Sequence, residues 1–275
     1  MRPFVVLAGA GIGACALAWL LRVIESTKSC HITNAISNEF EPIRYKFNST
    51  IYIINTTEKC RKVIRMFQSQ CERFPVLGFD CQWEQYGSYR KKVALLQLVC
   101  DGGLCALIKL RDMDEIPSEL FRLLGDPSIL KVGMEPQNKA YNLWADYRIS
   151  VKGTLDLSTM YVSCGMYYTR SLAELALKVL NRNMMRMRPL RDSDWNQPIL
   201  NAYQIKYAEE VAYVSFELFL KLGEKAALCS MWTGRKIWLS ELRSKFSNEI
   251  IYSNKYNRSG ECLMVVDDLL NPMFV

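Results

Sequence analysis

Hydrophobic positions along the chain become regular at Ile51 and stay regular to Leu222. Short β-branched or continuously apolar runs indicate strands, whereas apolar residues three and four positions apart indicate helices. Strands are predicted at Ile51–Ile54, Val76–Glu84, Val93–Cys100, Leu104–Leu110 and Ile129–Val132. Helices are predicted from Thr57 to Phe67, and at Pro117–Gly125, Pro136–Ala145, Ser171–Leu180 and Asn201–Leu222. Three consecutive strands with short turns, followed by alternating helices and strands, predict an α/β fold with a mixed sheet.

The predicted strand Val76–Glu84 (VLGFDCQWE) carries the main site candidate. Apolar and polar residues alternate along it, as they do in a strand with one packed face and one polar face. Asp80 lies in the middle, where a carboxylate is costly to bury unless another group pairs with it. The strand alone fits two interpretations equally well, a functional carboxylate or one that is solvated or held in an ordinary ion pair.

An uncharged run of eighteen residues, Phe4–Leu21, lies near the N-terminus with an arginine close to each end. It is long enough to cross a bilayer as a helix, and we predict an uncleaved membrane anchor over residues 1–24. A cleaved secretory signal is the alternative, because residues 14–18 (ACALA) contain small-x-small cleavage patterns. In that case three sequons would face a secretory lumen, at Asn48, Asn55 and Asn257.

Composition gives weaker evidence on domain division, on the kind of partner and on metal binding. Residues 25–48 show no clear period and are predicted to form a linker, residues 49–224 the domain, and residues 225–275 an extension of unknown role. The net charge of +7 fits an anionic partner such as nucleic acid or an anionic membrane surface. The ten cysteines form no CxxC pair and His31 is the only histidine, which argues against a zinc site.

Seven short blocks of the sequence carry a resemblance to a known family: GFDCQW, VALLQL, GLCALI, ILKVG, SLAEL, SDW and QIKYA. In order and spacing they resemble the DEDDy branch of 3′–5′ exonucleases, which includes RNase D and the Werner exonuclease. The resemblance covers roughly Ile51 to Leu222 and implies an RNase H-like (DnaQ-like) fold, a mixed sheet flanked by helices. Within this branch the chain looks most like the exonuclease 3′–5′ domain-containing proteins that an N-terminal helix anchors to mitochondria. A mitochondrial membrane, with the outer one favoured, is therefore the expected location.

The resemblance also implies a reaction, two-metal hydrolysis of phosphodiester bonds. Four carboxylates hold Mg²⁺ or Mn²⁺ in the family, and a tyrosine orients the attacking water. Asp80 matches the first carboxylate and Tyr207 the tyrosine, but the other three ligand positions are Gln82, Lys139 and Val211.

These substitutions make metal binding unfavourable. A lysine about 4 Å from Mg²⁺ is repelled by roughly 8 kcal/mol at an effective dielectric constant near 20. We therefore expect a degenerate site without a bound cofactor. The Lys139 ammonium is predicted to take the place of a metal and pair with Asp80, with a further hydrogen bond from Gln82. Tyr207 is then expected to be a packed core tyrosine.

Two functions follow from this pattern. The first is non-catalytic: binding of single-stranded nucleic acid in the old substrate groove, or service as a partner or dimerisation module. Phosphate contacts and base stacking would come from Arg90, Lys91, Lys92, Arg182, Arg186, Arg188, Arg191 and Trp195. Solvated loop charge explains these clusters equally well.

The second is a working 3′–5′ exonuclease for single-stranded DNA or RNA that holds Mg²⁺ or Mn²⁺ with rearranged ligands. Glu84, Glu135 and Glu210 lie near the degenerate positions in sequence. Because glutamates are mostly exposed, we predict that these three are solvated surface residues. The distinguishing feature is whether three or more carboxylate oxygens converge on Asp80.

Overall fold

The computed structural model describes residues 43–44, 50–184, 188–226, 235–247 and 250. The predicted anchor, most of the predicted linker and the last residues of the predicted extension lie outside this part of the chain. Among the described residues, no helix combines the length and the apolar character needed to cross a bilayer.

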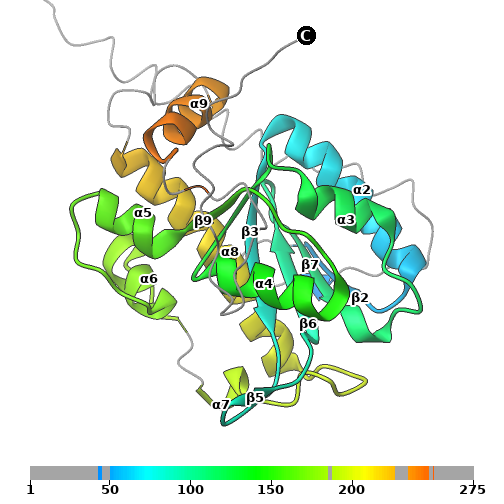
Figure 1. The fold of residues 1–275 in the computed structure, drawn as a ribbon. Helices are drawn as coiled ribbons and strands as arrows, with labels where there is room; N and C mark the ends of the chain where they lie inside the picture. Colours follow the sequence, from blue (N-terminus) through cyan, green and yellow to red (C-terminus); the bar gives the residue numbers. More distant parts are fainter. Residues whose placement is uncertain (1–42, 45–49, 185–187, 227–234, 248–249, 251–275) are drawn as a thin grey trace, which may run out of the picture. The chain divides into compact units, whose positions relative to one another are not determined.

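Seven strands form one mixed sheet in the order β1-β2-β7-β6-β3-β8-β9 (Figure 1). Their bounds are Ile43–Arg44 (β1), Thr50–Ile54 (β2), Val76–Gln82 (β3), Leu95–Val99 (β6), Leu104–Lys109 (β7), Leu130–Gly133 (β8) and Thr154–Asp156 (β9). Antiparallel pairing of β3 with β6 and of β6 with β7 confirms the predicted meander. Parallel pairs join β2 to β7, β3 to β8 and β8 to β9, which makes the sheet mixed as predicted.

Among the described residues the helices are α2 (Thr57–Arg73), α3 (Ser118–Gly125), α4 (Pro136–Tyr147), α5 (Leu157–Ser163), α6 (Leu172–Leu180), α7 (Arg188–Arg191), α8 (Ala202–Ala226) and α9 (Arg235–Lys245). Helix α8 packs across β3, β6, β7 and β8 and also against α6, while α2 packs against α3, β2 and β7 (Figure 1). Ser171 accepts a hydrogen bond from the Glu174 amide, so the predicted cap of α6 is confirmed. The cap of α2 is Thr56 and not Thr57 as predicted.

Strand β3 differs from its prediction in length and in exposure. It ends at Gln82, and all seven of its residues are buried, so the face that carries Asp80 and Gln82 is polar as predicted but covered by protein. The physical reason is α8, which lies so close that a Cβ added at Gly78 would overlap the carbonyl oxygen of Ala212. Asp80 and Gln82 follow Gly78 at alternate positions, and the polar residues of β3 are therefore covered by protein instead of water.

Several elements were not predicted. The polar stretch after β3 forms a two-stranded ribbon, β4 (Gln85–Tyr86) and β5 (Tyr89–Arg90), where only a turn was expected. Ile43–Arg44, expected in the linker, pairs with β2. Strand β9 and helices α5, α7 and α9 were also missed, because they are short or carry a weak hydrophobic period.

Candidate functional site

Asp80 and Lys139 form an ion pair between β3 and α4. The Lys139 ammonium nitrogen lies 2.8 Å from Asp80 Oδ1, and the two side chains are 13% and 10% exposed. The other carboxylate oxygen accepts a hydrogen bond of 3.0 Å from Gln82 Nε2. Both oxygens of Asp80 are therefore occupied by protein donors. The predicted ion pair and the predicted hydrogen bond from Gln82 to Asp80 are confirmed.

The turn between β8 and α4 places Lys139 for this contact. Its ammonium also donates to the carbonyl of Met134, the residue that follows β8. Glu135 has a left-handed backbone, with φ at 45°, and donates its amide to Asp156 Oδ2 at 3.0 Å. Pro136 then opens α4, where its fixed φ suits the first helical position.

Asp156 is a second carboxylate near Lys139 and was not predicted. Burial raises its pKa above the usual value near 3.8, while amide hydrogen bonds from Ser158 and Glu135 and the Lys139 charge act in the opposite direction. Ser158 donates to Asp156 Oδ1 at 2.8 Å, and Asp156 thereby caps α5. The Lys139 ammonium thus lies in the field of two carboxylates, of which only Asp80 is in direct contact.

Gln97 on β6 links the site to α8. It is the cross-strand partner of Asp80, and its Oε1 accepts from Gln82 Nε2 at 3.4 Å. Its Nε2 donates a hydrogen bond of 3.1 Å to the carbonyl of Ala208. Sequence reasoning missed Gln97, although a lone amide in the apolar run VALLQLVC was a visible signal.

Tyr207 and Val211 lie on the same helix, α8. Val211 is buried and apolar, so it offers no ligand atom. Tyr207 is half-buried and packs against the hydrophobic core with its ring 6.0 Å from that of Trp195, as expected of a core tyrosine. Burial and then the charge of Asp80 raise the pKa of Tyr207 above its usual value near 10, which keeps the phenol neutral.

A pair of divalent cations does not fit these residues. An ammonium contacts the remaining carboxylate, and the other ligand positions present an amide and an aliphatic side chain. Within the described ranges, no three Asp, Glu, His or Cys side chains come together in a way that would hold a metal ion. Glu84, Glu135 and Glu210 accordingly do not join Asp80 in a ligand cluster.

The prediction that all three glutamates are solvated is nevertheless wrong. Glu84 is only 3% exposed and accepts from Lys91 Nζ at 2.8 Å and from the Tyr86 hydroxyl at 2.6 Å, with Asn196 as a third donor. Burial alone would raise the pKa of Glu84, but these hydrogen bonds lower it to about 2. Glu210 is also buried, and only Glu135 keeps substantial exposure.

Several of the side chains predicted to contact nucleic acid form ion pairs within the protein. Arg90 donates to both oxygens of Asp146, at 2.7 and 3.0 Å, and Lys91 is paired with Glu84. The ion-pair partner of Arg182 is Glu217, and that of exposed Arg191 is Asp192. The Arg188 side chain and all of Arg186 lie outside the described residues.

Trp195 and Lys92, also predicted to contact nucleic acid, form no ion pair among the described residues. Trp195 is fully buried and donates its indole N–H to the Arg191 carbonyl at 3.0 Å, so the prediction that it stacks on bases is wrong. Packing against the core near Tyr207 is the physical reason. Lys92 is exposed, and among the described residues it has no carboxylate partner.

Comparison with known proteins identifies the family. Residues 51–227 match the family model described as 3′–5′ exonuclease. The chain belongs to the 3′–5′ exonuclease family. The resemblance inferred from the seven sequence blocks is thereby confirmed, as is the α/β RNase H-like fold with its mixed sheet and flanking helices.

Two relatives carry the description exonuclease 3′–5′ domain-containing protein 2. The one from Drosophila melanogaster is 35% identical over 198 residues, which are 71% of this chain and 34% of the relative. The one from Homo sapiens is 35% identical over 168 residues, 57% of this chain and 26% of the relative. The chain therefore spans about a third or less of the length of these relatives.

A solved structure from this family is also similar in sequence. The crystal structure of the EXD2 exonuclease domain soaked in Mn is 30% identical, with 66% of this chain and 96% of that chain covered, at a TM-score of 0.40.

Proposed function

We propose that this chain is a non-catalytic member of the 3′–5′ exonuclease family that works as a binding module. The observation that carries the proposal is the Lys139 ammonium 2.8 Å from the Asp80 carboxylate, where a metal ion would have to bind. Catalysis in this family depends on divalent cations that neutralise charge on the scissile phosphate. A site that presents a cation, an amide and an aliphatic side chain does not attract such ions.

Single-stranded nucleic acid is the partner that we favour for this module. Support comes from membership of a nuclease family and from the net charge of +7. Electrostatic attraction to phosphates does not need an intact metal site, and it is sequence-independent. Because Arg90 and Lys91 are already paired with carboxylates, less positive charge is left to attract phosphates, and we expect modest affinity with a clear salt dependence.

The decisive experiment measures cleavage and binding on the same preparation. The 275-residue chain is incubated with single-stranded DNA or RNA labelled at its 5′ end and with Mg²⁺ or Mn²⁺. We expect no shortening of either strand, because three of the four ligand positions lack a carboxylate. In the absence of cleavage, fluorescence anisotropy with the same oligonucleotides is expected to report binding that weakens as salt rises.

The Asp80→Ala variant is the matched control. Cleavage that disappears in Asp80→Ala would show an active exonuclease with rearranged ligands and would overturn the proposal. Cleavage that persists in Asp80→Ala comes from a contaminating nuclease. If the chain binds neither DNA nor RNA, nucleic acid is not its partner. The binding module would then have to recognise another protein or a second copy of this chain.

A further inference from the structure

Two adjacent tyrosines are exposed on the loop between α5 and α6, residues 164–171. Tyr167 is 92% exposed and Tyr168 is 58% exposed, and Tyr167 is the most exposed large hydrophobic side chain in the described part of the chain. Neither belongs to the predicted set of nucleic-acid contacts. An exposed tyrosine at a fixed place on the surface suits recognition, because it offers a large contact area with few rotatable bonds.

The loop is held in place on both sides of these rings. Met166 is half-buried and packs against the hydrophobic core. Thr169 is buried, and its hydroxyl donates a hydrogen bond of 2.6 Å to the Glu174 carboxylate and accepts one of 3.1 Å from the Ser171 amide. The chain is therefore fixed one residue before the pair and one residue after it, although the rings themselves stay in water.

The loop lies beside the turn between β8 and α4, next to the degenerate metal site. Ser158 on α5 donates to the carbonyl of Thr169, and its hydroxyl lies 3.7 Å from the sulfur of Met134 in that turn. Arg170 follows in the loop, with its Nε 3.6 Å from the carboxylate of Glu135 in the same turn. Helices α4 and α5 both contact β9 (Figure 1). The two tyrosines thus belong to the surroundings of the degenerate site.

Arg170 adds a cation to this aromatic pair. Its guanidinium carbon lies 6.0 Å from the centre of the Tyr168 ring, and its Nε donates a hydrogen bond of 3.2 Å to the Tyr168 hydroxyl. The ion pair of Arg170 with Glu135 is open to water, since the two side chains are 76% and 43% exposed. Exposed pairs contribute little to stability, so the guanidinium can exchange Glu135 for another anion at small cost.

We propose that Tyr167, Tyr168 and Arg170 form a contact site for single-stranded nucleic acid, in which the rings stack on bases and the guanidinium binds a phosphate. The inference rests on the proposed function and deepens it. A nucleotide offers an aromatic face and an anionic phosphate, and proteins that bind single strands use aromatic and cationic side chains for these two contacts. The tyrosines take the stacking role that was predicted for Trp195, which is buried.

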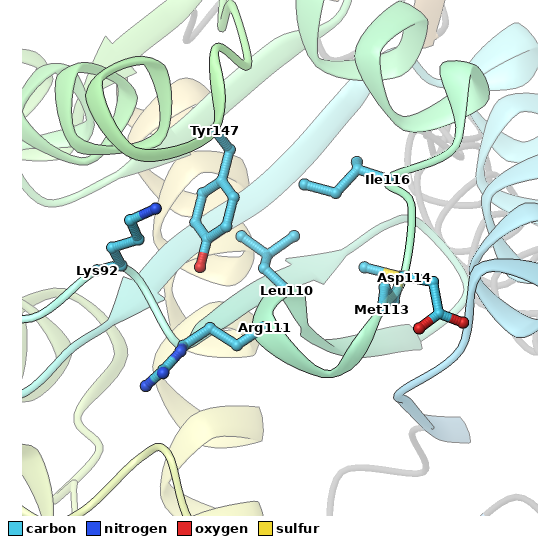
Figure 2. Close-up of a pocket in the computed structure, with 7 residues that line it drawn as sticks. All are labelled: Lys92, Leu110, Arg111, Met113, Asp114, Ile116 and Tyr147. Atoms are coloured by element: carbon cyan, nitrogen blue, oxygen red, sulfur yellow. The ribbon is translucent and has the colours of Figure 1, made fainter.

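A competing location lies at the other end of α4. Lys92 has its Nζ 5.9 Å from the centre of the Tyr147 ring, beside a surface hollow that Leu110 and Arg111 also line (Figure 2). Glu135 caps α4 and Tyr147 ends it twelve residues later, so the two locations are roughly 18 Å apart along the helix. The Tyr147 ring is half-buried and leaves less of its face for a base. The exposed rings therefore favour the loop.

Fluorescence anisotropy on the 275-residue chain tests the site with two labelled probes of equal length, oligothymidylate and a strand of abasic sites. We expect Tyr167→Ala and Tyr168→Ala each to weaken the binding of oligothymidylate about tenfold, as the loss of one stacked base does. Both variants are expected to bind the abasic strand like wild type, because it has no base to stack. Tyr168→Phe keeps the ring and is expected to keep the affinity for oligothymidylate.

The expected result for Arg170→Gln is different. Loss of one phosphate contact lowers the slope of log K against log salt by about 0.7 on a single strand. This decrease is expected with both probes, since both carry phosphates. The tyrosine variants are expected to keep the slope of wild type.

Tyr89→Ala is the matched control, because it removes a tyrosine on β5 that is 66% exposed, and it is expected to leave both affinities unchanged. Circular dichroism melts confirm that each variant is folded. A wild-type chain that binds neither probe contradicts the proposed function and this inference together.

Three results would overturn the inference alone, in a chain that binds oligothymidylate. The first is an affinity that neither Tyr167→Ala nor Tyr168→Ala lowers. The second is an equal loss on oligothymidylate and on the abasic strand, which would show that the rings do not stack on bases. The third is a loss in Lys92→Gln without a loss in Tyr168→Ala, which would place the strand at the other end of α4.

Discussion

Lys139 combines a charge with a long flexible stem, and it uses both to reach a carboxylate on a neighbouring strand. Its ammonium satisfies Asp80 and the Met134 carbonyl, while Gln82 satisfies the second oxygen of Asp80. A buried ion pair is not strong evidence for stability by itself, because desolvation offsets much of the attraction. Removal of only one partner is different, since the other charge is then left desolvated and unpaired.

We therefore predict that Lys139→Ala lowers the free energy of unfolding by about 3 kcal/mol, the low end of the range for breaking a buried pair. Lys139→Asp is expected to destabilise more, because two carboxylates then face each other, with partial recovery when Mg²⁺ or Mn²⁺ is added. Urea denaturation measures both changes. Lys178→Ala breaks an exposed pair with Glu174 and is expected to cost at most about 0.5 kcal/mol. A loss below about 1 kcal/mol in Lys139→Ala would contradict the stabilising role of the pair.

At the scale of elements, the connection between α3 and β8 shows how a buried lysine organises a turn. Lys131 in β8 is fully buried, and its ammonium donates to the carbonyls of Asp126 at 2.7 Å and Ile129 at 2.9 Å. From α9, Arg243 donates to the carbonyl of Ser128 in the same turn. One short connection thus joins the sheet to a helix that lies more than a hundred residues later in the chain.

The titration of Lys131 makes the stability of the domain depend on pH. Burial lowers the pKa of Lys131 to about 7, from a usual value near 10.5. Between these values the unfolded chain holds the proton and the folded chain does not, so the free energy of unfolding rises with pH. From pH 7 to 8.5 we predict that wild type gains about 1–2 kcal/mol relative to Lys131→Met.

Denaturant titrations at both pH values measure this gain. The upper limit of pH 8.5 keeps the measurement below the range in which the buried thiols of Cys60 and Cys71 affect stability. Burial raises the pKa values of these two thiols to about 12 in the folded chain. These thiols act in the opposite direction above about pH 9, where the unfolded chain loses its thiol protons first. The exposed Lys178→Met variant is expected to follow wild type. Equal slopes for wild type and Lys131→Met would show that Lys131 does not titrate in this window.

At the scale of the whole molecule, we propose that residues 1–24 anchor the domain to a mitochondrial membrane, with the outer membrane favoured. The support is the uncharged run Phe4–Leu21, which has the length of a bilayer-spanning helix. Among the described residues, the sheet and its helices are built from positions at and beyond Ile43. Removal of the run is therefore expected to change location without unfolding the domain.

Deletion of residues 1–24 is predicted to move the protein from the membrane pellet to the supernatant, as measured by fractionation and carbonate extraction. A variant with Arg73→Gln and an intact N-terminus is expected to stay in the pellet. A cleaved signal peptide would give a different product. A secreted protein that begins near Trp19, with glycans on Asn48 or Asn55, would show that the run is a signal peptide.

Local patterns predicted most of the elements that build the domain. The meander of β3, β6 and β7 and the helices α2, α4, α6 and α8 follow from hydrophobic period and capping residues, which depend on near neighbours in sequence. The ribbon β4–β5 was missed because two-residue strands hold too few positions to show a period. The burial of the polar face of β3 was missed because its cover, α8, begins 120 residues after Gln82 ends the strand.

The amino-acid sequence by itself determined the family and the mixed sheet, because family motifs and hydrophobic periodicity are properties of short segments. The Asp80–Lys139 pair could be predicted only because the family resemblance supplied the place of Lys139 in the fold. Only the tertiary structure decided which charges are compensated. Arg90 pairs with Asp146, which is 56 positions later, and the carboxylate of Glu84 accepts a hydrogen bond from Asn196, which is 112 positions later. The cost of a buried charge depends on partners brought together by folding. For the same reason, the buried position of Trp195 emerged only with the fold.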